Sequence, residues 1–319
     1  MPSLLRRRRS PAPAVLALLG LLALGLAPGE LGAQVRFDAA SGDYFVMVRN
    51  DQGALVEMRV EPPNKVRVTL TPTVEAAGAL LRYRYAAAVT TESRQELAFL
   101  EIDCPGAALV QAFAAQVTVQ GATASWFAEF VDFPGRPSCS FERGADGLPI
   151  GGVLVGQFET PLRLAIGGAR ALGKTVGVSW PTSDPRPDNE EAGEVVATLS
   201  GLTGGWWALT TVVPARDPSL FNDPGQAFAL VAGDLEQLCG PLGWITSGGV
   251  CNSLRVKLEH AGQAAAGGDI QNARDLLDSF LNELEAQHGA EPGKHVTDNA
   301  YFLLKTNVEL LRSRLGQPN

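Results

Sequence analysis

The spacing of apolar residues changes once along this chain, and that change constrains the fold more than any other feature. As far as about Val213, apolar and polar residues alternate in short runs, as over 43–49, 55–60 and 66–71. Alternation predicts strands with one buried face, because successive side chains of a strand point to opposite sides. Similar runs cover 81–89, 95–102, 116–119, 125–131, 152–158, 175–180 and 194–199. Many short strands between Gly, Pro, Asn and Asp predict an antiparallel β-sandwich, Ig-like or jelly-roll-like, over 34–213.

From Cys251 onward the apolar residues recur every three or four positions, which predicts amphipathic helices. The three stripes are Leu254, Leu258 and Ala261; Ala273, Leu276, Leu277, Phe280, Leu281 and Leu284; and Ala300, Leu303, Leu304, Val308 and Leu311. Asp269 and Thr297 are suited to cap the second and third helices. The chain is therefore predicted to be a multidomain β-then-α protein, with a small helical bundle over 234–316. Residues 214–233 hold three prolines and are expected to be an exposed linker.

The first 33 residues have the pattern of an export signal. Four arginines at 6–9 precede an apolar run at about 14–26, and small residues follow, up to Ala33. This pattern predicts a signal peptide cleaved between Ala33 and Gln34. The apolar run is shorter than the roughly 20 residues of a membrane span, although an uncleaved N-terminal anchor stays an alternative. The predicted location is secreted or extracytoplasmic, in the periplasm or at the cell surface.

The charge balance excludes some classes of partner. The chain holds 26 basic and 34 acidic residues, a formal net charge of −8, and removing the signal arginines makes it more acidic. Nucleic acids and anionic membranes are bound by clustered Lys and Arg. Outside the signal no strongly basic run occurs, so we expect neither partner for the mature chain.

The four cysteines are expected to form disulfides, because their number is even and the chain carries an export signal. Three pairings are possible. Proximity and the change of periodicity favour Cys104–Cys139 and Cys239–Cys251, and four buried free thiols are the less favoured alternative. The cysteine spacings match no zinc pattern, and we expect no metal and no cofactor.

The C-terminal quarter resembles a known module. Residues 243–254 read GWITSGGVCNSL and lead into Lys257, Leu258 and Ala261; the pattern A…L…F follows, and then AQ.G…VT…A..L. This order resembles the FIMAH domain, a helical module of many bacterial adhesins and hydrolases. Ala290-Glu291-Pro292 is an insertion relative to it. The resemblance implies an extracellular accessory module without catalytic residues. The N-terminal half is loosely similar to sandwiches of uncharacterised exported bacterial proteins, which implies fold only.

One segment matches the phosphate-loop pattern G-x4-G-K-T, from Gly168 to Thr175. A phosphate loop must follow a strand and open directly into a helix. The sequel, 176–181, alternates and stops at a proline, which indicates a strand. The match is therefore interpreted as an accidental glycine turn between two strands, and no nucleotide is expected.

Trp206 and Trp207 are the candidate ligand-binding residues. Adjacent residues of a strand face opposite ways, so both cannot enter one sandwich core. One of them is then free to bind a carbohydrate or a peptide. The alternative is that the second packs against the helical part.

No catalytic constellation is evident. The three histidines, His260, His288 and His295, lie in the helical part, and no G-x-S-x-G or H-E-x-x-H motif occurs. Four acids of one loop, Asp184, Asp188, Glu190 and Glu191, have the oxygen ligands that calcium prefers, but not the spacing of a calcium loop.

These observations predict a non-enzymatic, exported binding or attachment protein whose partner is an extracellular carbohydrate or protein. Two alternatives stay open. One is a secreted hydrolase of glycans or peptides, which would need two carboxylates roughly 5 to 10 Å apart in a groove. The other is a structural protein of the cell envelope.

Overall fold

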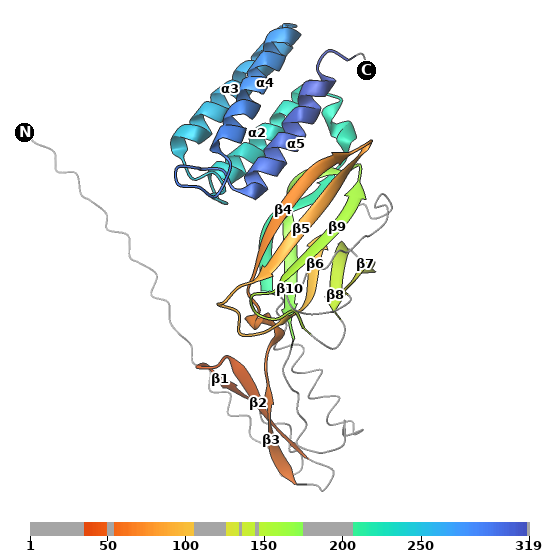
Figure 1. Ribbon diagram of the computed structural model, residues 1–319, viewed down its shortest axis with the longest axis vertical. Helices are drawn as coiled ribbons and strands as arrows, with labels where there is room; N and C mark the ends of the chain where they lie inside the picture. Colours follow the sequence, from red (N-terminus) through yellow and green to blue (C-terminus); the bar gives the residue numbers. More distant parts are fainter. Residues whose placement is uncertain are drawn as a thin grey trace, which may run out of the picture.

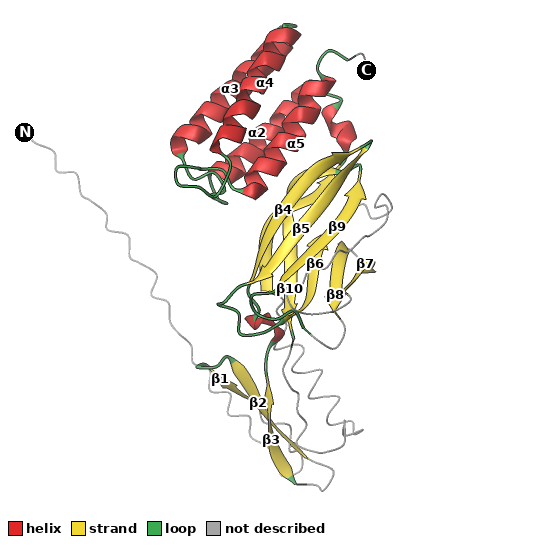
Figure 2. Cartoon of the chain, in the orientation of Figure 1, coloured by secondary structure: helices red, strands yellow, loops and turns green. Residues whose placement is uncertain are grey.

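A computed structural model describes residues 35–49, 54–104, 126–133, 136–143, 147–174 and 207–317. Three antiparallel sheets come first along the chain and four helices follow (Figures 1 and 2). The predicted order, a β region and then a helical region, is confirmed. The signal segment and its cleavage site at Ala33 and Gln34 lie outside the described residues.

The first sheet stands apart from the others. Its order is β1-β2-β3, with β1 at Val35–Asp38, β2 at Asp43–Arg49 and β3 at Leu55–Val60. It lies at the end of the molecule opposite the helices (Figure 1). The expectation of a single sandwich from residue 34 is therefore wrong. The physical reason is Pro62-Pro63, which cannot donate ladder hydrogen bonds and ends the strand run in the short helix η1, Pro63–Lys65.

An ionic cluster joins this sheet to η1. Asp43 is fully buried at the start of β2 and accepts hydrogen bonds from Lys65 and Arg59. Burial alone would raise the pKa of Asp43, but hydrogen bonds from Lys65, Arg59 and Ser41 hold that pKa below its usual value. A buried carboxylate with several donors is stable in its ionised form.

The two remaining sheets face each other. One has the order β11-β10-β6-β8-β7 and the other the order β4-β5-β9. Their strands are β4 Val68–Ala77, β5 Leu80–Val89, β6 Leu97–Asp103, β7 Trp126–Phe133, β8 Arg136–Arg143, β9 Val153–Thr160, β10 Arg163–Gly173 and β11 Trp207–Arg216. Two buried tyrosines of β5 bridge the sheets: Tyr83 donates to the Leu162 carbonyl at 2.5 Å, and Tyr85 donates to the Val212 carbonyl at 2.9 Å.

The helical part has one helix more than the periodicity predicts. Its helices are α2 Pro224–Cys239, α3 Gly248–Ala266, α4 Ile270–Gln287 and α5 Asp298–Arg314. The stripes predicted for α3, α4 and α5 are buried wholly or in part, and Asp269 and Thr297 are N-caps as expected.

The linker expected at 214–233 is wrong. It contains the end of β11, the short helix η3 (Pro218–Phe221) and much of α2. Two of its three prolines stand at helix starts, Pro218 in η3 and Pro224 in α2, where a missing N–H costs nothing, and Asp223 caps the Gln226 amide. A stripe spaced by four and three residues then packs inward: Ala227, Val231, Leu235 and Leu238.

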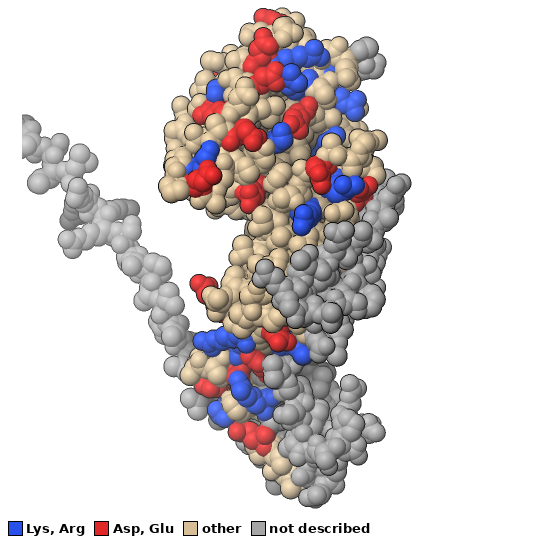
Figure 3. Space-filling view, in the orientation of Figure 1, with Lys and Arg blue, Asp and Glu red and all other residues tan. Residues whose placement is uncertain are grey.

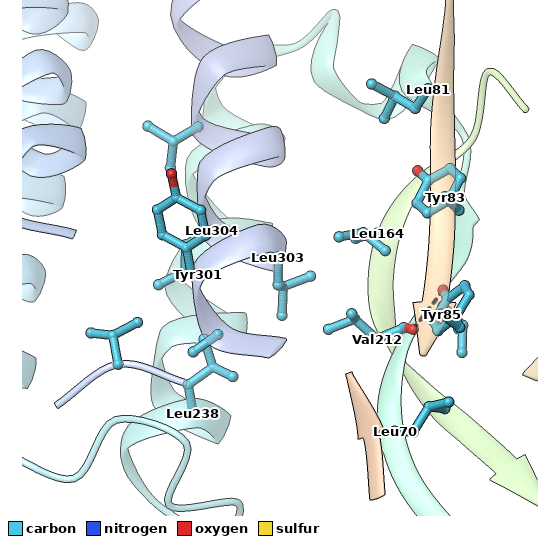
Figure 4. Close-up of a cluster of buried hydrophobic side chains, with 14 of the residues drawn as sticks. Leu70, Leu81, Tyr83, Tyr85, Leu164, Val212, Leu238, Tyr301, Leu303 and Leu304 are labelled. Carbon is cyan, nitrogen blue, oxygen red and sulfur yellow. Dashed lines mark hydrogen bonds between the residues drawn. The ribbon is translucent and has the colours of Figure 1, made fainter. Parts of the chain in front are cut away.

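Helix α5 is buried on more than one side, because it lies between the other helices and the sandwich. It contacts β4, β10 and β11 as well as α2 and α4. Figure 4 shows Leu303 pointing toward Leu164 of β10 and Val212 of β11. The apolar core of the sandwich therefore continues into the bundle as one cluster.

Polar contacts fix the same interface. The Asn299 side-chain oxygen accepts from the Thr211 hydroxyl at 3.0 Å and from the Val212 amide at 3.1 Å. Asn307, fully buried, donates to the Leu164 carbonyl at 3.1 Å. The Arg216 guanidinium donates to both oxygens of Asp234 in α2, at 2.6 and 2.8 Å. The two parts thus share a core and a set of polar contacts.

Both predicted disulfides are present. Cys104 follows β6 and pairs with Cys139 of β8, with Cα atoms 5.6 Å apart; Cys239 ends α2 and pairs with Cys251 of α3, with Cα atoms 5.9 Å apart. The second disulfide joins helices α2 and α3. Within the described part of the chain, no helix is both long enough and apolar enough to cross a membrane.

Candidate functional site

The glycine segment that matches a phosphate loop lies inside a strand. Residues from Gly168 to Gly173 belong to β10, and Lys174 just after it lies 3.8 Å from Glu96. The expected glycine turn is therefore wrong, because the strand continues through these glycines. Close packing accounts for two glycines of β10: a Cβ on Gly167, just before the matched segment, would lie 2.3 Å from a Val213 methyl, and one on Gly168 2.9 Å from Asp103. Thr175 lies outside the described residues.

Two carboxylates lie on one face of β6 and are the pair that a hydrolase would need. Glu101 and Asp103 share the face opposite Leu100 and Ile102, because side chains alternate along a strand. Both are engaged: Glu101 accepts from Arg170 at 2.6 Å, and Asp103 accepts from the Gly168 amide at 2.9 Å. Glu101 is only 1% exposed, so a substrate has no access to it. This arrangement weighs against two-carboxylate hydrolysis at this site.

Of the two candidate tryptophans, Trp206 lies outside the described residues and Trp207 is the first residue of β11. Trp207 stands opposite buried Ala171, so its side chain shares the inner face of the sheet. It is half-buried and packs against the shared core, with the Arg67 guanidinium 5.9 Å from its ring. This placement makes Trp207 a packing residue at the edge of the sandwich.

The histidines serve the helix connections. His288 stacks on Tyr301 with ring centroids 3.9 Å apart, and its Nε2 lies 2.7 Å from Asp298. Burial and the hydrogen bond to Glu285 raise the pKa of Tyr301, which keeps the phenol protonated as a donor. His295 contacts the Thr246 hydroxyl at 3.1 Å, and His260 is exposed.

The described residues contain no cluster of side chains suited to hold a metal ion. No group of three or more His, Cys, Asp or Glu side chains gathers there to hold a metal ion. The loop acids Asp184, Asp188, Glu190 and Glu191 lie outside the described residues, so the calcium alternative rests on sequence alone.

An apolar hollow of about 270 Å³ lies between α2 and α3. Phe228 lies beside Gly262, where a Cβ would sit 3.6 Å from its ring. The charged side chains at its edge are Glu236, Arg255 and Glu259. Figure 3 shows basic and acidic side chains interspersed over the visible face of the helical part.

A larger and polar hollow, which we call the junction hollow, lies where η3, the start of α2 and the end of α5 meet. Its volume is about 640 Å³, and its lining residues are Ser219, Asn222, Asp223, Pro224, Gln226, Arg314 and Gln317. A volume of this size holds a small ligand. Six of the seven lining residues are polar, which separates this hollow from the apolar one.

Local folding explains which of these polar groups are free. Asp217 and Asp223 cap the backbone amides of Ser219 and Gln226. Hydrogen bonds from Ser219 lower the pKa of Asp217. Four other side chains have no hydrogen-bond partner among the described residues: those of Asn222, Gln226, Arg314 and Gln317. Their donors and acceptors remain available to a ligand.

Sequence reasoning missed the junction hollow because its residues were divided between the expected linker and the chain's last residues. One signal was available: the pattern Asp223-Pro224 is typical of a helix start. No protein-family model matches this chain, and no curated protein matches it, so the resemblance to the FIMAH domain stays a prediction.

Proposed function

We propose that this chain is an exported, non-catalytic binding or attachment protein, and that the junction hollow holds its ligand. The observation that carries the proposal is the set of unpartnered polar side chains around a hollow of about 640 Å³. Polar groups that converge on a concave surface without bonding one another are typical of a ligand site.

Two further observations support binding over catalysis. The carboxylates Glu101 and Asp103 are tied to neighbouring groups. The pairing of His288 with Asp298 joins the end of α4 to the start of α5, and Tyr301 stacks on that histidine. The two disulfides fit a protein that works in an oxidising compartment.

The test is an array of immobilised polysaccharides and extracellular proteins, probed with the mature chain from Gln34. A matched pair of variants locates the site. Gln226→Trp fills the junction hollow, whereas Gln237→Trp places the same side chain at an exposed position of α2 outside it. We expect the wild type and Gln237→Trp to bind the same small set of immobilised ligands. Gln226→Trp should bind these ligands at least tenfold more weakly.

Two results would overturn the proposal. Binding that both variants retain equally would place the ligand elsewhere. Release of cleavage products from bound array material, detected by mass spectrometry, would show a hydrolase instead. N-terminal sequencing of exported protein tests the export step, and we expect it to begin at Gln34.

A further inference from the structure

We propose that the ligand of the junction hollow is a sugar that carries a carboxylate, with Arg314 binding the carboxylate and the carboxamides binding the hydroxyl groups. This inference rests on the proposed function and specifies the chemical class of its ligand. Three features of the hollow support it: an arginine without a partner among the described residues, amides suited to hydroxyl groups, and a described lining almost without apolar side chains.

The first feature is positive charge without a counter-ion. Arg314 lines the hollow, and its side chain has no hydrogen-bond or ion-pair partner among the described residues. Arg163, at the start of β10, also lacks one, and its Nε is buried without an acceptor. Arg163 does not line the hollow; burial, and then the charge of Arg314, lower its pKa.

The acids near these arginines are engaged elsewhere. Glu309, which acts on Arg163, pairs with Lys305 at 2.6 Å. Asp217 and Asp223 cap backbone amides. Arg314 is the one cationic residue among the described lining residues, and Asp223, the one acid among them, already accepts the Gln226 amide. A carboxylate ligand matches the planar fork of the Arg314 guanidinium in two parallel hydrogen bonds.

The second feature is the set of carboxamides. Asn222, Gln226 and Gln317 each offer one acceptor and two donors without a described partner. Hydroxyl groups both donate and accept, so neighbouring hydroxyls of a sugar ring match such amides. An acidic peptide would present apolar side chains as well, and Pro224 is the only apolar residue among the described residues that line the hollow. These observations favour an acidic sugar over an acidic peptide.

The experiment is calorimetric titration of the mature protein with short oligomers of galacturonic acid. Galactose oligomers of the same linkage and length are the neutral control, and a tetra-aspartate peptide is the acidic control without hydroxyl groups. We expect the acidic oligomer to bind at least tenfold more tightly than either. Its affinity should fall between 50 and 500 mM salt, because exposed ionic contacts are screened.

Variants assign the contacts. Arg314→Gln should lower the affinity for the acidic oligomer at least tenfold and leave the weak affinity for the neutral oligomer unchanged. Arg314→Lys should recover part of the lost affinity. Arg312→Gln is the matched control: this neighbouring arginine pairs with Asp278 and does not line the hollow. Gln226→Ala should weaken both sugars. Thermal melts of each variant separate lost binding from lost folding.

Each contrary outcome overturns a defined part. If the acidic and neutral oligomers bind equally and both lose binding in Gln226→Trp, the ligand needs no carboxylate, but the hollow is still its site. Tighter binding of tetra-aspartate through Arg314 makes the partner an acidic peptide. If none of the three probes binds at millimolar concentration while array binding still depends on Gln226, the ligand is not an acidic sugar, and the proposed function is unaffected.

Discussion

Substitution of Asp234 by alanine tests whether the sandwich and the helical part are held by a desolvated ion pair. The Arg216 and Asp234 side chains are 12% and 7% exposed, and two N–O contacts of 2.6 and 2.8 Å join them. Removing one member of a buried pair leaves the other charge without compensation, at a cost of about 3 to 5 kcal/mol. We therefore expect Asp234→Ala to lower the free energy of unfolding by about that amount.

The assay is urea unfolding of the mature chain, followed by two signals. Far-ultraviolet circular dichroism reports mainly the helices, and tryptophan fluorescence reports mainly the part of the sequence before the helices, where four of the five tryptophans occur. Asp278→Ala is the matched control, because its partner Arg312 binds it through a similar contact, with side chains 42% and 45% exposed. Exposed pairs of this kind contribute about 0.2 to 1 kcal/mol.

The double substitution Arg216→Met/Asp234→Leu removes both charges, and we expect it to recover most of the stability. If Asp234→Ala were no more destabilising than Asp278→Ala, the pair would be solvated and the interface loose. If the two signals separated in the wild type, the parts would unfold independently, as the change of periodicity alone suggests.

Three further predictions follow from other contacts. Replacing Cys239 and Cys251 by serine should lower the free energy of unfolding by about 3 kcal/mol in urea titrations, because the disulfide closes a short loop; an unchanged midpoint would contradict this. Asp43 has a lowered pKa when folded, so its stabilising effect should be present above an unfolded pKa of about 3.9 and be lost as the pH falls below that value; Asp43→Asn should flatten the pH dependence of unfolding there. Neither the wild type nor Lys174→Ala should show saturable ATP binding. ATP binding by the wild type that is lost in this variant would show that the phosphate-loop match is not accidental.

Much of this fold follows from local patterns. Strands β2 and β3 coincide with their predicted ranges, because alternation and turn residues act over a few positions. The stripes of α3, α4 and α5 are equally local. The disulfide pairing required only proximity along the chain and the division into two regions.

The predictions from sequence are wrong where residues distant along the chain determine the local structure. The strand β10 runs through a glycine-rich segment because its neighbours Val213 and Asp103 occupy the space of absent side chains. No local pattern reveals those neighbours. The burial of Asn307 has the same origin: its carboxamide reaches a carbonyl 143 residues earlier in the chain. The division into a sandwich, a linker and a bundle failed at α2 because Pro224 was interpreted as a breaker rather than as a helix start.

The position of the junction hollow gives a final prediction about stability. Its lining comes from η3, α2 and α5, and α5 also carries Asn299 and Asn307 into the sandwich. The described lining therefore belongs to the helical part, and α5 connects it to the sandwich. A ligand that binds only the folded state at one hundred times its Kd raises the free energy of unfolding by about 2.7 kcal/mol. Because the parts share one core, we expect this increase in both the helical and the tryptophan signals. An increase confined to the helical signal would mean that the ligand stabilises the bundle alone and that the shared core does not couple the two parts.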